Sequence, residues 1–443
     1  RALSSHEIDT DEIPKTVSGF VSRFGAAELK KLLEKRATQV SELSVQAEFK
    51  QTEYWRETLL YNWWTQRWAR GNKIKVDWTD HRSTSLAQFC YGYNHIFDQL
   101  TERGRNQLKG RLRDSLQNST LDPLSFEIET AIHLEQRGFR VFFKDLESEA
   151  TYDLLAADSN ASYEIECKYL RRDTGSKIKG LPFAQLCDRV RPVLLGALKH
   201  AQHSLMVKLT LATSLPRTEA DQATILARIK TAIEVGKTIE HSTFNVGVSQ
   251  FDGSEALRIS TADGEDSNYF LRDHLRNELG IYGAPFIVVR FQKKFAVLAV
   301  SSTTEKSIFE PVYKDLKHAS DKQFSGSKPS VIITAMGAYT KADFVELHKY
   351  SRRGLPTLLE HVGERLLRAQ ERDHVHGVVF CSTEYCEQHE TFAPMFNAAL
   401  TSYSSSREMF AMRNLKAAGS RATMLRLFGS AKARKAQYFA HSP

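Results

Sequence analysis

The spacing of apolar residues divides the chain into a helical first part and an alternating second part. Before about residue 120, apolar side chains recur every three or four positions, as they do from 26 to 49. That spacing puts them on one helix face and predicts helices. From Leu121 onward, helical stretches alternate with short apolar runs such as "RVFF" (140–143) and "VIIT" (331–334). Such an alternation is typical of α/β domains with a central sheet.

Changes in this pattern indicate how the chain is organised. Boundaries are expected where a helical texture, a polar loop or a run of basic residues replaces what precedes it. We expect a mainly helical accessory region at 1–120, the first part of an α/β core at 121–204, an α/β insertion or accessory part at 205–300, the second part of the core at 301–404, and a basic tail at 405–443.

The composition is that of an ordinary globular protein, and the sequence argues against a membrane-spanning protein and an NTP-driven motor. The 443 residues are 41% hydrophobic and 26% charged. No apolar run approaches the roughly 20 residues of a membrane-spanning helix, so we expect no membrane partner. The sequence also lacks the G-x-x-x-x-G-K-[ST] phosphate loop, so an NTP-driven motor is not expected within this chain.

The net charge of +8 is concentrated at one end of the chain. From Arg407 onward there are eight Lys or Arg residues and one acid, which gives +7 and leaves about +1 for the other 406 residues. Such a tail could contact the phosphates of a nucleic acid. A solvated, loosely ordered terminus is the alternative, and the sequence leaves both open.

Five scattered cysteines are too few for a disulfide framework and favour a reducing, cytoplasmic setting. One stretch gathers potential zinc ligands, namely His374, His376, Cys381, Cys386 and His389. Imidazole and thiolate are the usual ligands of zinc, but this spacing matches neither a finger nor a ribbon. A packed strand that carries surface histidines is therefore the favoured interpretation.

The segment "TYDLLAADSNASYEIECKYL" (151–170) is typical of two strands joined by a turn. If its central "SN" forms a two-residue turn, residue i lies opposite residue 319 − i, so Asp153 lies opposite Glu166. Opposed like charges destabilise an antiparallel pair. Two carboxylates at this spacing suit Mg²⁺ or Mn²⁺, and Lys168 on the same face could orient a water molecule. A salt bridge from Lys168 to either acid is the alternative.

A further carboxylate precedes this hairpin on the predicted helix "SFEIETAIHLEQRG" (125–138). Glu127 leads a face that continues through Ala131 and Leu134, and this face should pack towards the sheet. A carboxylate at the head of a packing face is destabilising unless it is paired or bound to a metal. Glu129 is expected on the exposed side, although a rotation of the helix would turn it inward instead.

These pieces in this order resemble the PD-(D/E)xK nuclease superfamily, which has a restriction-endonuclease-like fold. In that family a helix carries a glutamate, a strand follows, a second strand brings an aspartate and a third supplies (D/E)-x-K. Here the pieces read "FEIETAIHLEQRGFRVFF", "TYDLLAA" and "YEIECKYL". Tyr152 departs from the family, which has a proline before the aspartate. The resemblance implies an α/β fold with a mixed central sheet flanked by helices, to which this chain adds an N-terminal helical region and an α/β insertion.

The resemblance also implies roles for individual residues. It implies that Asp153, Glu166 and Glu127 bind Mg²⁺ or Mn²⁺ together with the backbone carbonyl of Cys167. Glu127 would do so directly or through a water molecule. Lys168 would be the catalytic lysine.

Contacts with the nucleic acid are expected beyond the metal ligands. Family members often carry Lys or Gln on the next core helix, and two pairs fit and remain open: Lys199 with Gln202, or Lys322 with Gln323. In the second case, roughly residues 205–300 are an insertion within the core. A basic loop after the motif is placed to meet a phosphate backbone and contains Arg171, Arg172, Lys177 and Lys179. All of these positions could instead be solvated surface.

The features predict a metal-dependent endonuclease that hydrolyses phosphodiester bonds, with DNA favoured as its substrate and defence or repair as its setting. A catalytically silent nucleic-acid-binding or scaffold subunit with the same fold is the alternative. Cleavage of both strands of a duplex needs two active sites or two turnovers, so a homodimer is expected. Membership of a larger defence or repair complex is a further expectation.

Overall fold

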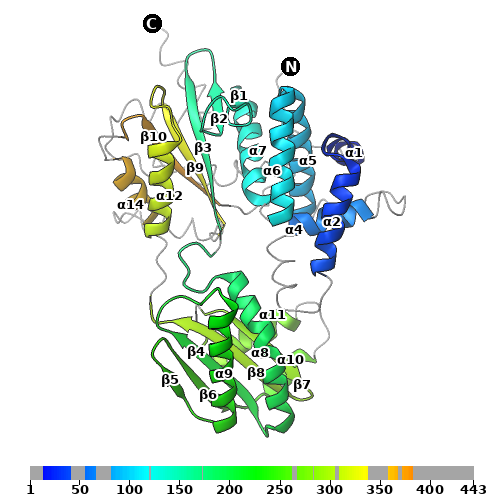
Figure 1. The fold of residues 1–443 in the computed structure, drawn as a ribbon, viewed down its shortest axis with the longest axis vertical. Coiled ribbons are helices and arrows are strands. Elements are labelled where there is room, and N and C mark those ends of the chain that lie inside the picture. The colour runs from blue at the N-terminus through cyan, green and yellow to red at the C-terminus, as the bar shows by residue number, and fades with distance from the viewer. Residues whose placement is uncertain are drawn as a thin grey trace. The chain divides into compact units, whose positions relative to one another are not determined.

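The computed structural model describes residues 13–40, 55–65, 81–118, 121–171, 173–261, 267–282, 284–304, 309–337, 358–367 and 372–382. The chain divides into two compact units (Figure 1). The first contains the described elements before residue 175 and after residue 307, and the second contains those from 175 to 304. Each unit is α/β, with a mixed sheet flanked by helices, as the sequence predicts for the fold class.

The sheet of the first unit has five strands in the order β1-β2-β3-β9-β10. These are β1 (Arg140–Phe143), β2 (Leu154–Ala157), β3 (Ser162–Leu170), β9 (Ser330–Met336) and β10 (Val375–Ser382). Strand β2 is antiparallel to both β1 and β3, whereas β3, β9 and β10 are parallel. Parallel neighbours need a long crossover connection, and all strands and helices described from residue 175 to 304 lie in the crossover from β3 to β9.

The predicted hairpin and its register are confirmed. Leu154 pairs with Ile165 and Ala157 with Ser162, so the two numbers sum to 319 along the ladder. The turn is held by Asp158, whose Oδ1 accepts hydrogen bonds from the backbone N–H groups of Asn160 (2.8 Å) and Ala161 (2.9 Å).

Among the described residues, six helices precede this sheet, and the five before residue 120 agree with the helical pattern of that region. They are α1 (Ile13–Phe24), α2 (Ala26–Val40), α4 (Trp55–Trp64), α5 (His81–Gln99), α6 (Glu102–Asn118) and α7 (Leu121–Gln136). Gly138 adopts a φ of 85° just after α7, the left-handed conformation that ends many helices. Buried side chains run without interruption from Phe20 through Tyr93 and Leu134 to Ile165. The helices expected as an accessory region therefore share one core with the sheet.

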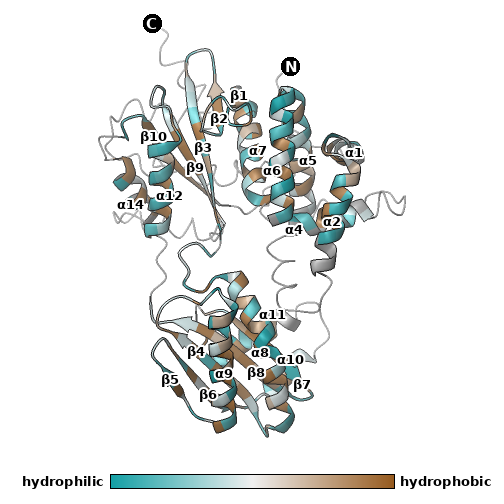
Figure 2. Ribbon diagram, viewed as in Figure 1, coloured by the Kyte–Doolittle hydropathy of each residue, from teal (hydrophilic) through white to brown (hydrophobic). Residues whose placement is uncertain are grey.

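The other face of the first sheet is covered by α12 (Phe309–Lys322) and α14 (Leu358–Leu367). Leu316 of α12 and Val362 of α14 lie in one buried cluster with Ile332 of β9. Within this unit α12 is therefore the helix that follows β3. Figure 2 shows apolar residues along the strands and more polar ones along α6.

The sheet of the second unit has the order β5-β6-β4-β8-β7. Its elements are α8 (Gly180–His200), β4 (Ser204–Leu211), α9 (Glu219–Val235), β5 (Ile239–His241), β6 (Phe244–Phe251), α10 (Ser254–Ser260), α11 (Ser267–Glu278), β7 (Phe286–Phe291) and β8 (Lys294–Ser302). Apolar side chains of α8 and α9 cover one face, and those of α10 and α11 cover the other.

The division at Gly175 differs from the expected boundary between residues 204 and 205. The reason is α8, whose buried Val190 and Leu194 share a core with Val207 of β4. An apolar helix face indicates that the face is buried, but it does not indicate against which sheet. The second unit thus begins about thirty residues earlier than expected.

Strand β10 is the packed strand that was predicted from the sequence in preference to a zinc site. Cys381 is buried in it, and the Nε2 of His374 lies 3.1 Å from the carbonyl oxygen of Ser320. Cys386 and His389, like the basic tail at 405–443, lie outside the described residues. Among the helices that are described, none is both long and apolar enough to cross a membrane.

Candidate functional site

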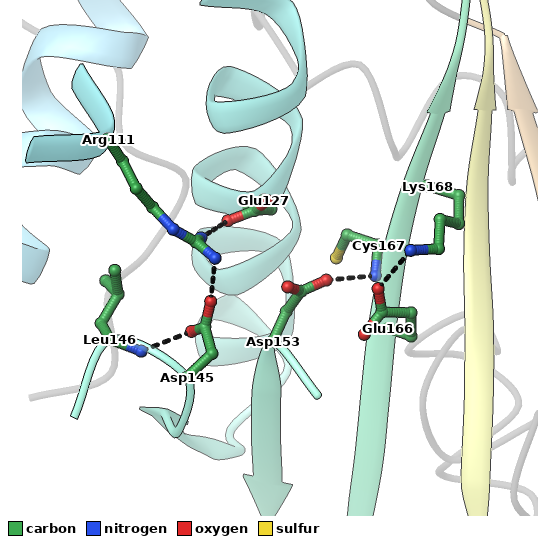
Figure 3. A network of polar contacts seen from close by, with 8 residues as sticks. All are labelled: Arg111, Glu127, Asp145, Leu146, Asp153, Glu166, Cys167 and Lys168. Atoms are coloured by element: carbon green, nitrogen blue, oxygen red, sulfur yellow. Dashed lines mark hydrogen bonds and ion pairs between the residues drawn. The ribbon is translucent and has the colours of Figure 1, made fainter. Parts of the chain in front are cut away.

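Three carboxylates of the first unit come together at one end of the β1–β2 hairpin. They belong to Glu127 on α7, Asp145 in the turn after β1, and Asp153 just before β2. One oxygen from each lies within 4.8 Å of the other two (Figure 3). Glu127 and Asp153 were predicted from the sequence, and Asp145 was not.

Local structure explains why these residues meet. Phe143 and Leu154 are paired at the ends of β1 and β2, so Asp145 and Asp153 leave the sheet at the same end. Asp145 is fixed by its Oδ1, which accepts a hydrogen bond from the N–H of Leu146 at 2.7 Å. Glu127 faces this end from α7, which packs against both β1 and β3.

Asp153 is also tied to the third strand. Its Oδ2 accepts a hydrogen bond from the backbone N–H of Cys167 at 2.7 Å, and Asp153 is almost completely buried. One step beyond the terminal pair of the ladder, Leu154 with Ile165, Asp153 stands opposite Glu166, as the register requires. The expectation that the carbonyl of Cys167 binds a metal stays a prediction.

Glu166 and Lys168 form an ion pair beside this group. Lys168 Nζ lies 2.6 Å from Glu166 Oε1, and the Glu166 side chain is only 2% exposed. Its other oxygen, Oε2, is buried and has no hydrogen-bond partner among the described residues. The predicted ligand set and the observed group share Glu127 and Asp153, but the observed group contains Asp145 in place of Glu166.

An arginine reaches the cluster from α6. Arg111 Nη1 lies 2.7 Å from Glu127 Oε2, and its Nη2 forms an ion pair with Asp145 Oδ2 (Figure 3). Sequence reasoning missed Arg111 because it is one of several basic residues on a polar helix, and nothing in its spacing sets it apart.

Burial raises the pKa of all four carboxyl groups. It holds the pKa of Glu127 well above its ordinary value, with the charge of Asp153 as a second cause. Burial raises the pKa of Asp145 to about 6, and burial with the nearby Asp153 raises that of Glu166 to about 8. The pKa of Asp153 is also raised by burial, although the N–H of Cys167 opposes the shift. Bound cations would relieve this crowding of buried acids.

Glu129 was expected on the exposed side of α7, but it is buried. It is 9% exposed, accepts a hydrogen bond from Ser125 Oγ at 2.8 Å and lies 3.7 Å from the guanidinium of Arg56. It therefore packs towards α4, away from the cluster, while Glu127 is the residue of α7 that reaches it. A buried arginine accounts for the inward turn of a second glutamate on the same helix.

The residues expected to contact nucleic acid are divided between the two units. Lys199 and Gln202 are exposed at the end of α8 in the second unit, and Lys177 and Lys179 also lie there, partly buried. The first unit holds the exposed Arg171 and Lys322 and the partly buried Gln323; Arg172 lies outside the described residues.

Of the two alternative Lys–Gln pairs, only Lys322 and Gln323 belong to the unit that carries the carboxylate cluster. The backbone carbonyl of Gln323 accepts a hydrogen bond from Thr151 Oγ1 at 2.6 Å, two residues before Asp153. Lys322 ends α12, the helix that follows β3 in this unit.

Searches of family models, curated proteins and solved structures with this chain returned no match. The function proposed below therefore rests on the residues of the site and their geometry.

Proposed function

We propose that the protein is a metal-dependent nuclease that hydrolyses phosphodiester bonds, with DNA as its substrate. The observation that carries the proposal is the meeting of Glu127, Asp145 and Asp153 within 4.8 Å, beside the Glu166–Lys168 pair. The order α7, β1, β2, β3, α12, β9 supports a restriction-endonuclease-like core in the first unit, because it follows the helix, three strands and next helix of that family.

The residues present suit a hard divalent cation such as Mg²⁺ or Mn²⁺, which prefers carboxylate oxygens. Asp153 and Glu166 would hold it, while Glu127 and Asp145 offer further carboxylate oxygens beside Asp153. The buried Glu166 Oε2 has no hydrogen-bond partner among the described residues, and a cation would give this oxygen a partner. A cation would also stabilise the ionised form of the four carboxyl groups, whose pKa values are all raised. When bound, the ion would polarise the phosphate and activate a water molecule.

Lys168 supplies the positive charge that the protein itself brings to the reaction. Its amino group is fixed by Glu166 and its side chain is 24% exposed, so it can still meet a substrate. There it would orient the attacking water or stabilise the negative charge that develops on the phosphate.

The proposal is tested by incubating plasmid and oligonucleotide DNA with the protein and Mg²⁺ or Mn²⁺. Lys168→Ala and Asp153→Asn should each lower cleavage by at least a hundredfold. Lys230→Ala removes another lysine paired with a glutamate, on α9, and should leave cleavage unchanged. Equal cleavage by the wild type and both site variants would refute the proposal.

A second candidate is a nucleic-acid-binding or scaffold protein without catalysis. The Glu166–Lys168 ion pair favours it, because each side chain already has a partner in the metal-free protein. This candidate predicts salt-sensitive DNA binding with no cleavage under either divalent cation.

A further inference from the structure

Arg111 places a cation on the carboxylate cluster. Its two terminal nitrogens contact Glu127 and Asp145, two of the three residues whose oxygens lie within 4.8 Å of one another. The side chain is 38% exposed, whereas those of Glu127 and Asp145 are 15% and 11% exposed. The cluster of the free protein is thus already engaged by a positive charge that belongs to α6.

The charges of the site leave room for one divalent ion. Four acids influence one another's pKa here, and the cations that act on them are Arg111 and Lys168. A metal ion binds ionised carboxylates, and with all four acids ionised the four negative and two positive charges sum to −2, which one divalent cation neutralises. A second divalent cation would leave +2 in partly buried surroundings, which is strongly unfavourable.

The chemistry of the guanidinium makes the contact of Arg111 with Glu127 and Asp145 a lasting one. Its planar fork matches carboxylate oxygens, and two charge-assisted contacts are stronger than one. Arginine stays protonated at any pH at which the protein is folded, so the contact is not released by titration. A metal ion can gain Glu127 and Asp145 only by displacing Arg111.

We infer that Arg111 competes with divalent cations for Glu127 and Asp145, so that the free protein binds one such ion and keeps a second one out. This inference rests on the proposed metal site and adds a limit on its occupancy. Arg111 therefore limits metal occupancy, and it belongs to α6 in the helical region that precedes the nuclease-like motif.

The test is calorimetric titration of the full chain with Mn²⁺, without nucleic acid. The wild type should bind one Mn²⁺ per chain, and Arg111→Met, which keeps a long side chain without the charge, should bind a second. Arg113→Met is the matched control, because Arg113 lies two residues along α6 and pairs with Glu28 outside the cluster. It should behave as the wild type does. An Arg111→Met protein with the stoichiometry and affinity of the wild type would overturn the inference.

Two further variants make the result decisive. Adding Asp145→Asn to Arg111→Met should abolish the second ion, because one of its ligands is lost. If Arg111→Met does not unfold cooperatively, Arg111→Lys replaces it, since lysine keeps the charge but cannot bridge two carboxylates. Mn²⁺ binding at least tenfold tighter than in the wild type then supports the inference, and equal binding overturns it. Calorimetry does not depend on cleavage, so a wild type that binds Mn²⁺ but cuts no DNA contradicts only the proposed nuclease.

Discussion

At the scale of single residues, the candidate site concentrates buried acids whose ionisation destabilises the folded chain. Glu166 is the clearest case, because its side chain is 2% exposed and its pKa is raised to about 8, chiefly by burial. In an unfolded chain a glutamate titrates near 4.3, roughly its ordinary value. Between these two values the folded state binds a proton that the unfolded state does not. Stability must therefore fall as the pH rises through this range.

We predict this loss in a metal-free protein kept in chelator. From pH 6.5 to 8 the free energy of unfolding of the wild type should decrease by about 1 kcal/mol per pH unit more than that of Glu166→Gln. Urea unfolding at several pH values measures both slopes. The histidines are common to both proteins, so their contribution cancels when the two slopes are compared. Parallel slopes would show that Glu166 does not carry the raised pKa.

Added Mn²⁺ should oppose the loss of stability at higher pH. A metal binds the ionised carboxylate, so it competes with protons for Glu166. The increase in melting temperature caused by Mn²⁺ should therefore be larger at pH 8 than at pH 6.5. Thermal unfolding followed by circular dichroism measures it, and an equal increase at both pH values would contradict direct ligation by Glu166.

At the scale of elements, β3 carries two glutamates with different tasks. Glu164 is fully buried and accepts hydrogen bonds from the backbone N–H of Ser325 at 2.9 Å and from the Ser325 hydroxyl. It fixes the loop between α12 and β9, whereas Glu166, two residues on, belongs to the candidate site.

Glu164→Ala should lower the free energy of unfolding by about 2 kcal/mol, because it leaves the N–H of Ser325 without its charged acceptor. Mn²⁺ affinity should change little. Glu164→Gln, which can still accept a hydrogen bond, should be less destabilised. Urea unfolding combined with calorimetry separates the two effects, and a tenfold loss of Mn²⁺ affinity in Glu164→Ala would place this residue in the metal site instead.

The same elements show how much could be predicted from the sequence. The hairpin register was predictable because Tyr163, Ile165 and Cys167 alternate with charged residues, and a slip by one position would exchange them. Glu127 was predictable from the face it shares with Leu134. Asp145 was not, since a turn has no periodicity that fixes the direction of a side chain.

At the scale of the whole molecule, the second unit is inserted between two adjacent strands of the first. Its sheet is covered on both faces by its own helices, with buried residues that include Val207, Leu298, Phe295 and Leu275. A unit with its own core can fold alone. Residues 175–307 expressed separately should therefore give a circular dichroism spectrum with helix and strand and a cooperative thermal transition. A featureless melt would mean that this unit needs the remainder of the chain.

The position of this insertion also orders events on the ribosome. Leu170, at the end of β3, is made long before Ser330, which begins the neighbouring strand β9. At roughly 5–20 residues per second, the intervening segment takes on the order of 10 s to synthesise. All four acids and both cations of the cluster have emerged by then, yet β3 still lacks one of its two neighbours. A nascent chain therefore carries the complete chemistry of the site well before it carries the sheet that supports it.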